Sequence, residues 1–265
     1  MMFFPETHTN NNFQPANYCH LEAYPMKYKI QGDIMQTASV ALEQGETIYA
    51  GASAMQWMTD NVEMKSKMRG GIGGGIGRLF SGESLFLNEF NVKEGNTGMV
   101  TFSSDFPGKI LSFELKKGQT LIAQSTAFMA ADNSVEMEIF LQKKLGAGFF
   151  GGEGFILQKI TGPGTVLLSI DGEITSLELE KGQRILCDPG SVATFDPTIA
   201  FDIQRAGDIK TMVFGGEGLF LASLEGPGEV HLQSMQLSDL AQKIAPMVAQ
   251  HIPRNNNGPT INLGR

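Results

Sequence analysis

Apolar and polar residues alternate along short stretches in the middle of the chain, and turn-forming residues separate these stretches. Val40 and Leu42, for example, precede Gly45, and Ile48 follows it. A period of two indicates β-strands with one buried face. The pattern therefore predicts a protein built mainly from short strands.

One stretch of this kind occurs three times around a glycine. The sequences are VALEQGETIYA around Gly45, FELKKGQTLIA around Gly118 and LELEKGQRILC around Gly182, and they align without a gap. The central glycine predicts a hairpin turn in each copy. From Gly45 to Gly118 is 73 residues, and from Gly118 to Gly182 is 64.

A second repeated stretch is centred on a glutamate. The sequences are LFSGESLFLNEF at Glu83, FFGGEGFILQKI at Glu153 and VFGGEGLFLASL at Glu217. The glutamates are 70 and 64 residues apart, close to the spacing of the turn glycines. Two different units that alternate three times in one order indicate an internal triplication.

No repeat contains enough helix to cover a sheet, so the apolar strand faces must be buried against one another. We therefore expect an all-β protein of three pseudo-symmetric β-sandwich-like repeats, closed about a pseudo-threefold axis in one compact body. Residues 26–252 would form a single domain, between a disordered N-terminal arm (1–25) and a disordered tail (253–265). The pair Asp171-Gly172 predicts a further hairpin.

The only helix signal comes near the C-terminus, in SDLAQKIAPMVAQ. Ser238 can cap a helix there, and Leu240, Ile244 and Met247 share one face. We expect a short helix packed on the outside of the β body.

Charge and cysteine content narrow the class of protein. The net charge of −8 disfavours a nucleic-acid partner, because the phosphate backbone would be repelled. Cys19 and Cys187 form no disulfide framework, and residues 1–25 match no leader peptide, so the cytoplasm is the expected compartment. No stretch is long and apolar enough to span a membrane.

Several possible sites have ordinary explanations. The glycine run at residues 69–78 lacks the Gly-Lys-Ser/Thr ending of a phosphate loop, so a linker or hairpin tip is favoured, with membrane-surface association as an alternative. The pattern G-x-G-x-x-G at Gly146, Gly148 and Gly151 is followed by a strand rather than a helix, so it predicts no dinucleotide site. Trp57, Phe86, Phe149 and Phe150 are expected in the core.

Catalytic chemistry also has little support in the sequence. The four histidines, His8, His20, His231 and His251, are dispersed, so we expect neither a metal site nor a cofactor. Cys187 has no evident histidine partner and aligns with Ala50 and Ala123, which favours a small core residue over a nucleophile.

The strongest polar candidates are Glu83, Glu153 and Glu217, one in each repeat. We expect threefold symmetry to bring them to equivalent places, where they would bind a cation or a polar ligand at the shared axis. The favoured explanation, however, is that each carboxylate accepts hydrogen bonds from the backbone of its own glycine turn.

The segments SGESLFLNEF, FFGGEGFILQKITGPGTVLLS and VFGGEGLFLASLEGPG resemble bacterial members of the altered-inheritance-of-mitochondria protein family, formerly a domain of unknown function. The resemblance covers roughly residues 26–250. It implies a fold similar to the tryptophan RNA-binding attenuation protein, repeated three times. Eukaryotic relatives are associated with mitochondrial organisation, and the resemblance transfers neither RNA binding nor any other activity.

Two functional hypotheses follow. The first is a non-enzymatic scaffold or binding protein whose edge strands and loops contact a second copy of the chain or another protein. The second is an enzyme or small-molecule binder with a pocket between repeats.

Overall fold

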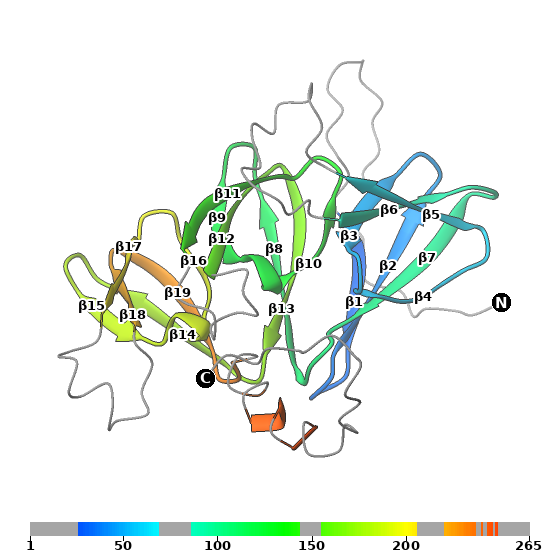
Figure 1. Ribbon diagram of the computed structural model, residues 1–265. Coiled ribbons are helices and arrows are strands. Elements are labelled where there is room, and N and C mark those ends of the chain that lie inside the picture. The colour runs from blue at the N-terminus through cyan, green and yellow to red at the C-terminus, as the bar shows by residue number, and fades with distance from the viewer. Residues whose placement is uncertain are drawn as a thin grey trace.

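The computed structural model describes residues 26–68, 86–143, 155–205, 220–236, 240, 243–245 and 247–248. Within these residues the chain is almost entirely strands and turns, which confirms the predicted all-β class (Figure 1). The strands pair antiparallel. Short sequence stretches in which apolar and polar residues alternate are typical of such strands, because only one face of each is buried.

Within the described residues, each repeat contributes six strands. Repeat 1 holds β2 (Thr37–Glu43), β3 (Thr47–Gly51), β4 (Met55–Met58), β5 (Val62–Met68), β6 (Phe86–Val92) and β7 (Thr97–Ser103). Repeat 2 holds β8 (Gly108–Leu115), β9 (Thr120–Gln124), β10 (Phe128–Asp132), β11 (Glu136–Lys143), β12 (Phe155–Thr161) and β13 (Gly164–Asp171). Repeat 3 holds β14 (Ile174–Leu179), β15 (Arg184–Cys187), β16 (Val192–Phe195), β17 (Ala200–Arg205), β18 (Phe220–Glu225) and β19 (Gly228–Gln233).

Every repeat is a small sandwich with the same internal order. In repeat 1, β2-β7-β4 lie in one sheet and β5-β6-β3 in the other, and β8-β13-β10 and β14-β19-β16 repeat the first arrangement. Even the irregularities recur, because the register of β4, β10 and β16 shifts at the equivalent residues Gln56, Met129 and Ala193. The three predicted pseudo-symmetric repeats are therefore present.

Neighbouring repeats share their sheets. Strand β3 of repeat 1 pairs with β10 of repeat 2, and β9 of repeat 2 pairs with β16 of repeat 3, so each pairing joins two half-sandwiches into one six-stranded sheet. The buried apolar clusters also cross these boundaries: Leu167 of repeat 2 packs with Val40 and Phe102 of repeat 1. The repeats thus form one body with continuous cores.

The glycine turns of the repeated sequence differ from the prediction. Gly45, Gly118 and Gly182 have φ of 91°, 78° and 80°, as tight turns require. The flanking strands, however, enter opposite sheets of the sandwich and do not pair with each other. These turns are arches rather than hairpins. The same holds for Asp171-Gly172, which links β13 to β14 in a different sheet.

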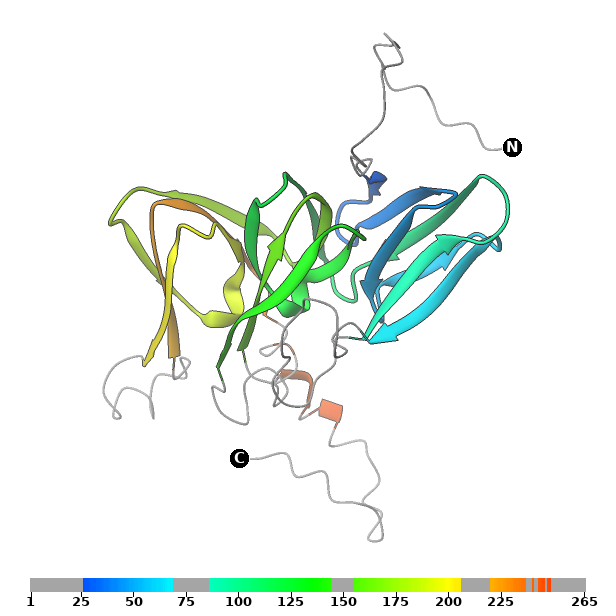
Figure 2. The same ribbon diagram turned by 90° about the horizontal axis from the view of Figure 1, so that it is seen from above.

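The expected closure about a threefold axis is not formed. In the described sheets, β4 and β15 are end strands, each paired on one side only. Their equivalents β10 and β16, and β3 and β9, are paired on both sides. Figures 1 and 2 show the consequence, with repeat 2 between repeats 1 and 3. The repeats form an open row. The prediction of closure is wrong because nothing in a repeated sequence fixes the angle between neighbouring repeats.

Short elements complete the description. Strand β1 (Lys27–Gln31) pairs with β2, and the 3₁₀ turns Ser125–Ala127 and Pro189–Ser191 precede β10 and β16. Residues 240, 243–245 and 247–248 are helical, which confirms the C-terminal helix. Its predicted apolar face is not buried, since Ile244 and Met247 are 45% and 65% exposed. No helix in the described part of the chain is long and apolar enough to cross a membrane.

Candidate functional site

The residues predicted to bind a ligand, Glu83, Glu153 and Glu217, lie outside the described residues, as do the glycine run 69–78 and Phe149 and Phe150. In the sequence the three glutamates fall between β5 and β6, between β11 and β12, and between β17 and β18. These are the paired strands of equivalent hairpins.

The junctions between repeats are the first feature that the structure itself brings forward. At the first junction Ala130 of β10 lies opposite Ala50 of β3, and at the second Thr194 of β16 lies opposite Ala123 of β9. All four residues are fully buried. The two junctions therefore use one register.

Side chains tie each junction together. The Tyr49 hydroxyl donates a hydrogen bond to the Val135 carbonyl over 2.7 Å at the first junction. The Thr194 hydroxyl donates to the Ile122 carbonyl, also over 2.7 Å, at the second. Buried bonds of this kind fix the register, because a slipped strand would leave their polar atoms unpaired.

The outer edge strands β4 and β15 carry exposed apolar side chains at positions where the equivalent strands of the internal junctions carry buried ones. Trp57 of β4 is 45% exposed, whereas its equivalents Ala130 and Thr194 are buried. Leu186 of β15 is 48% exposed, whereas its equivalent Ile122 is 1% exposed. The prediction that Trp57 belongs to the core is therefore wrong, because no strand in the described part of the chain lies beyond β4 to cover it.

Applying the junction register to these two edges gives a definite match. It would set Cys187 of β15 opposite Trp57 of β4, and Leu186 opposite Met58. Unpaired edges with exposed apolar side chains are uncommon in isolated proteins, since they promote association. The edges are complementary to each other, yet they lie at opposite ends of the row (Figure 1).

Cys187 is half-buried and packs against the third apolar cluster. Burial, with a smaller contribution from the neighbouring Asp188 carboxylate, raises the pKa of its thiol to about 12. The thiol is therefore protonated at neutral pH and is a poor nucleophile. This supports the interpretation of Cys187 as a packing residue.

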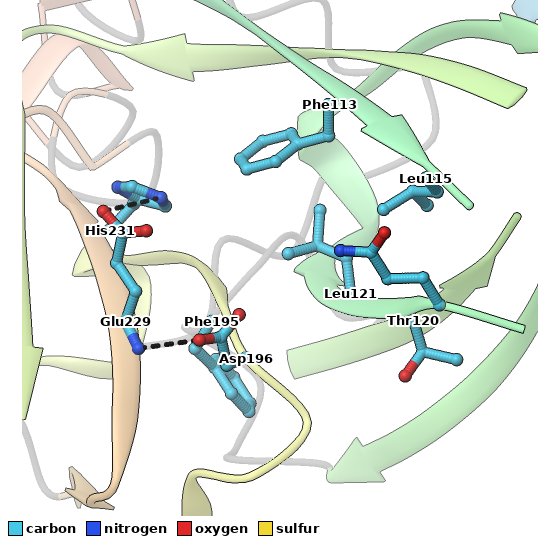
Figure 3. A pocket seen from close by; sticks show the side chains of 9 residues that line it. Phe113, Leu115, Thr120, Leu121, Phe195, Asp196, Glu229 and His231 are labelled. Atoms are coloured by element: carbon cyan, nitrogen blue, oxygen red, sulfur yellow. Dashed lines mark hydrogen bonds and ion pairs between the residues drawn. The ribbon is translucent and has the colours of Figure 1, made fainter.

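The second feature is a pocket of about 170 Å³ at the junction of repeats 2 and 3. Figure 3 shows Phe113, Leu115 and Leu121 on one side, with Asp196, Glu229 and His231 on the other. Strands β8 and β9 supply the apolar wall, and β19, with the turn after β16, supplies the polar wall. Gln119, Thr120 and Phe195 complete the lining.

One backbone hydrogen bond and two side-chain contacts hold the polar wall of the pocket in place. The Asp196 carboxylate accepts a hydrogen bond from the Glu229 amide over 2.9 Å. The two hydrogen-bonding atoms Nδ1 of His231 and Oγ of Ser176 are 2.8 Å apart, and Nε2 of His231 lies 3.7 Å from a Glu229 carboxylate oxygen. The His231 ring also contacts Phe113, with ring centroids 5.8 Å apart.

Sequence reasoning missed both features. Asp196 is 64 residues after Asp132, and the two aspartates accept the equivalent backbone hydrogen bonds, from Glu229 and Thr165. Thr59 takes this role in repeat 1, where its hydroxyl accepts from the Met99 amide. Extending the repeat alignment to these positions would have pointed to the pocket wall.

Comparison with known proteins places the chain. Residues 28–235 match the family model described as mitochondrial biogenesis AIM24. An uncharacterised protein of Streptococcus pyogenes serotype M6 is 29% identical over 226 residues, which cover 82% of this chain and 87% of that protein.

A solved structure is also similar. The X-ray crystal structure of another Streptococcus pyogenes protein superposes with a TM-score of 0.68 at 26% sequence identity, covering 84% of this chain and 99% of that one. The family match spans most of the chain and includes all three repeats. The chain therefore belongs to the mitochondrial biogenesis AIM24 family, as the three repeated segments indicated.

Proposed function

We propose that this protein is a non-enzymatic scaffold that assembles head to tail, with β15 of one copy pairing with β4 of the next. The observation that carries the proposal is the exposure of Trp57 and Leu186 on two edge strands, each paired on one side only, whose internal equivalents are paired on both sides and bury the same positions. Pairing would extend the three-stranded row β15-β18-β17 and the row that ends in β4 into a longer sheet.

The register argument makes the contact specific. The internal junctions bury small or apolar residues at the positions of Trp57, Met58, Leu186 and Cys187. A contact between copies would give those four side chains the environment that their equivalents already have. Because the two edges differ, the interface is heterologous, which produces rings or filaments rather than symmetric dimers.

The assembly would act in the cytoplasm, and gene triplication would account for three units of one design. A fold like that of the tryptophan RNA-binding attenuation protein fits a chain whose repeats share sheets with their neighbours. Glu83, Glu153 and Glu217, one in each repeat, stay proposed ligand-binding residues.

A cysteine cross-link tests the proposed register. In a Cys19→Ser background, Trp57→Cys would place a thiol opposite the native Cys187 of the next copy, within the Cα separation of about 4.4–6.8 Å that disulfides need. Because the Cys187 thiol is protonated at neutral pH, oxidation is carried out with a copper catalyst at alkaline pH. We expect a ladder of covalent multimers, resolved by non-reducing electrophoresis. The same variant with Cys187→Ser should give no ladder.

A charge substitution tests the assembly itself. Trp57→Lys would place a charge where the next copy must pack, so we expect monomers by light scattering where the unmodified protein forms multimers. Phe140→Lys is the matched control, because Phe140 is 49% exposed on the edge strand β11, which has no role in a junction. A monomeric unmodified protein, or no ladder with Trp57→Cys, would contradict the proposal.

A further inference from the structure

The two internal junctions of the chain are equivalent in backbone but not in what fills them. The apolar residues Phe113, Leu115 and Leu121 of the second junction correspond to Val40, Leu42 and Ile48 of the first. His231 corresponds to Leu167. All four first-junction residues belong to one buried cluster that also contains Met26.

Met26 takes part in the first junction through its backbone as well. Its side chain is 8% exposed, and it lies immediately before β1, the strand that has no equivalent in the other repeats. Burial raises the pKa of the Asp132 carboxyl, and backbone hydrogen bonds from Thr165 and Met26 oppose this rise. Asp132 thus serves two backbone donors.

Asp196, the equivalent of Asp132, has a different situation. Its carboxylate accepts the Glu229 amide, which corresponds to Thr165, over 2.9 Å. Among the hydrogen bonds of the described residues no second donor reaches the Asp196 carboxylate, and β8, the equivalent of β2 at this junction, is an edge strand with no strand like β1 beside it. The pocket is thus lined by the equivalents of residues that share a buried cluster with Met26, and by the equivalent of Asp132, to which the Met26 backbone donates.

We propose that the pocket of the second junction binds a small primary amine with a short unbranched apolar chain. The ammonium group would donate to Asp196, as the Met26 amide does to Asp132, and the chain would lie between Phe113 and Leu121. The inference rests on the difference between two internal junctions, so it does not depend on head-to-tail assembly.

Charge and size both favour this class of ligand. Two carboxylates, Asp196 and Glu229, line the pocket, and its lining contains no lysine or arginine. Aromatic faces such as Phe113 and Phe195 add to the attraction of a cation. A volume of about 170 Å³ is close to that of cavities that hold a benzene-sized molecule (about 150 Å³).

Binding to the full chain tests the proposal with two probes that share one side chain. L-methioninamide carries the ammonium group and the chain of Met26, whereas N-acetyl-L-methionine keeps the chain but is an anion. We expect saturable binding of L-methioninamide at neutral pH by calorimetry, with NMR shifts at His231, and no binding of N-acetyl-L-methionine.

Two variants locate the site. His231→Trp places a much larger side chain in the pocket wall, so it should fill part of the pocket and abolish binding. Asp196→Asn retains an acceptor for the Glu229 amide but removes the charge, so affinity should fall about tenfold or more. Glu114→Gln is the matched control: Glu114 lies between Phe113 and Leu115 on the opposite face of β8 and should leave the affinity unchanged.

Three results would overturn the proposal. They are failure of L-methioninamide to bind, equal binding of N-acetyl-L-methionine, and undiminished binding by both His231→Trp and Asp196→Asn. The second variant keeps the test decisive if the first fails to fold.

Discussion

Asp171, at the end of β13, is a carboxyl group whose surroundings disfavour its charge. Burial, and next the nearby Asp105 carboxylate, raise its pKa from 3.8 to about 6. Its backbone amide donates a hydrogen bond to the Gln233 side chain. No basic side chain contributes to lowering the pKa of the Asp171 carboxyl. The folded protein therefore holds this proton more tightly than the unfolded chain.

This difference predicts a pH dependence of stability. Between pH 3.8 and about 6 the folded state binds more protons at Asp171 than the unfolded state, so its contribution to stability falls as pH rises through this range. Asp171→Asn removes the penalty and should stabilise the protein at neutral pH by about 1 kcal/mol, allowing for partial exposure. Below pH 3.8 the gain should vanish.

Urea unfolding at several pH values would measure this effect. Asp105→Asn is the control, because it removes only the second cause of the raised pKa and should give a smaller gain at neutral pH. If the difference in stability between Asp171→Asn and the unmodified protein were the same at pH 3 and pH 7, the assignment to Asp171 would be wrong.

At the residue scale the sequence predicts which positions face inward, but not which of them are finally covered. Val40 and Leu42 alternate and are buried as predicted. Trp57 follows the same alternation and is 45% exposed, because no strand among the described residues pairs with the open side of β4. His231 looks isolated in the sequence because the pocket wall that faces it, Phe113, Leu115 and Leu121, comes from strands more than a hundred residues earlier.

At the element scale, the recurrent feature is the glycine arch that carries the chain from one sheet of the sandwich to the other. Gly118 has φ of 78°, and a Cβ atom added to it would meet nothing within 4 Å. Its requirement for glycine is thus conformational. Gly162 differs, because an added Cβ would lie 2.6 Å from the Leu115 carbonyl oxygen.

Substitutions at these two glycines should separate the two effects. Gly118→Ala should cost about 1–2 kcal/mol through the left-handed backbone, and Gly118→Asn less, since asparagine tolerates that conformation. Gly162→Ala should cost more, because the backbone itself must move. Denaturant unfolding of the three variants measures the order, and equal losses for Gly118→Ala and Gly118→Asn would contradict the conformational explanation.

The arches also show the limit of local sequence signals. A turn glycine between two alternating runs predicts a hairpin at each of four positions, and the prediction is wrong at each of them: Gly45, Gly118, Gly172 and Gly182. The local conformation was predicted correctly, since all four have positive φ. Whether the flanking strands pair with each other depends on competing partners elsewhere, such as β7 for β2 and β6 for β3.

At the scale of the whole molecule, the repeated alignment correctly predicted three like units, and the structure adds their arrangement. Shared sheets join repeat 1 to repeat 2 and repeat 2 to repeat 3, and the row stays open at β4 and β15. Closure could not be judged from the sequence, because each unit carries the same pairing strands whether the row ends after three units or continues through another molecule.

The net charge makes a prediction about the proposed assembly. Copies that each carry −8 repel one another, and the proposed contact consists of backbone hydrogen bonds and apolar side chains rather than ion pairs. Raising the ionic strength from about 0.01 M to about 0.15 M shortens the screening length from about 30 Å to about 8 Å. The multimeric fraction should therefore rise.

Light scattering at fixed protein concentration measures this change. Trp57→Lys is the control and should stay monomeric at both salt concentrations. A fall in the multimeric fraction with added salt would indicate a contact held by opposite charges, contrary to the proposed β4–β15 pairing.

The inequality of the two outer strands has a practical consequence. A copy with a substitution that blocks only β15 would still have an intact β4. It could bind to the end of a multimer through β4, and its own β15 could not bind the next copy. Leu186→Lys should therefore act as a chain terminator, shortening multimers of the unmodified protein when it makes up only a small part of the mixture. Trp57→Lys should do the same from the other end, and a double variant should be inert.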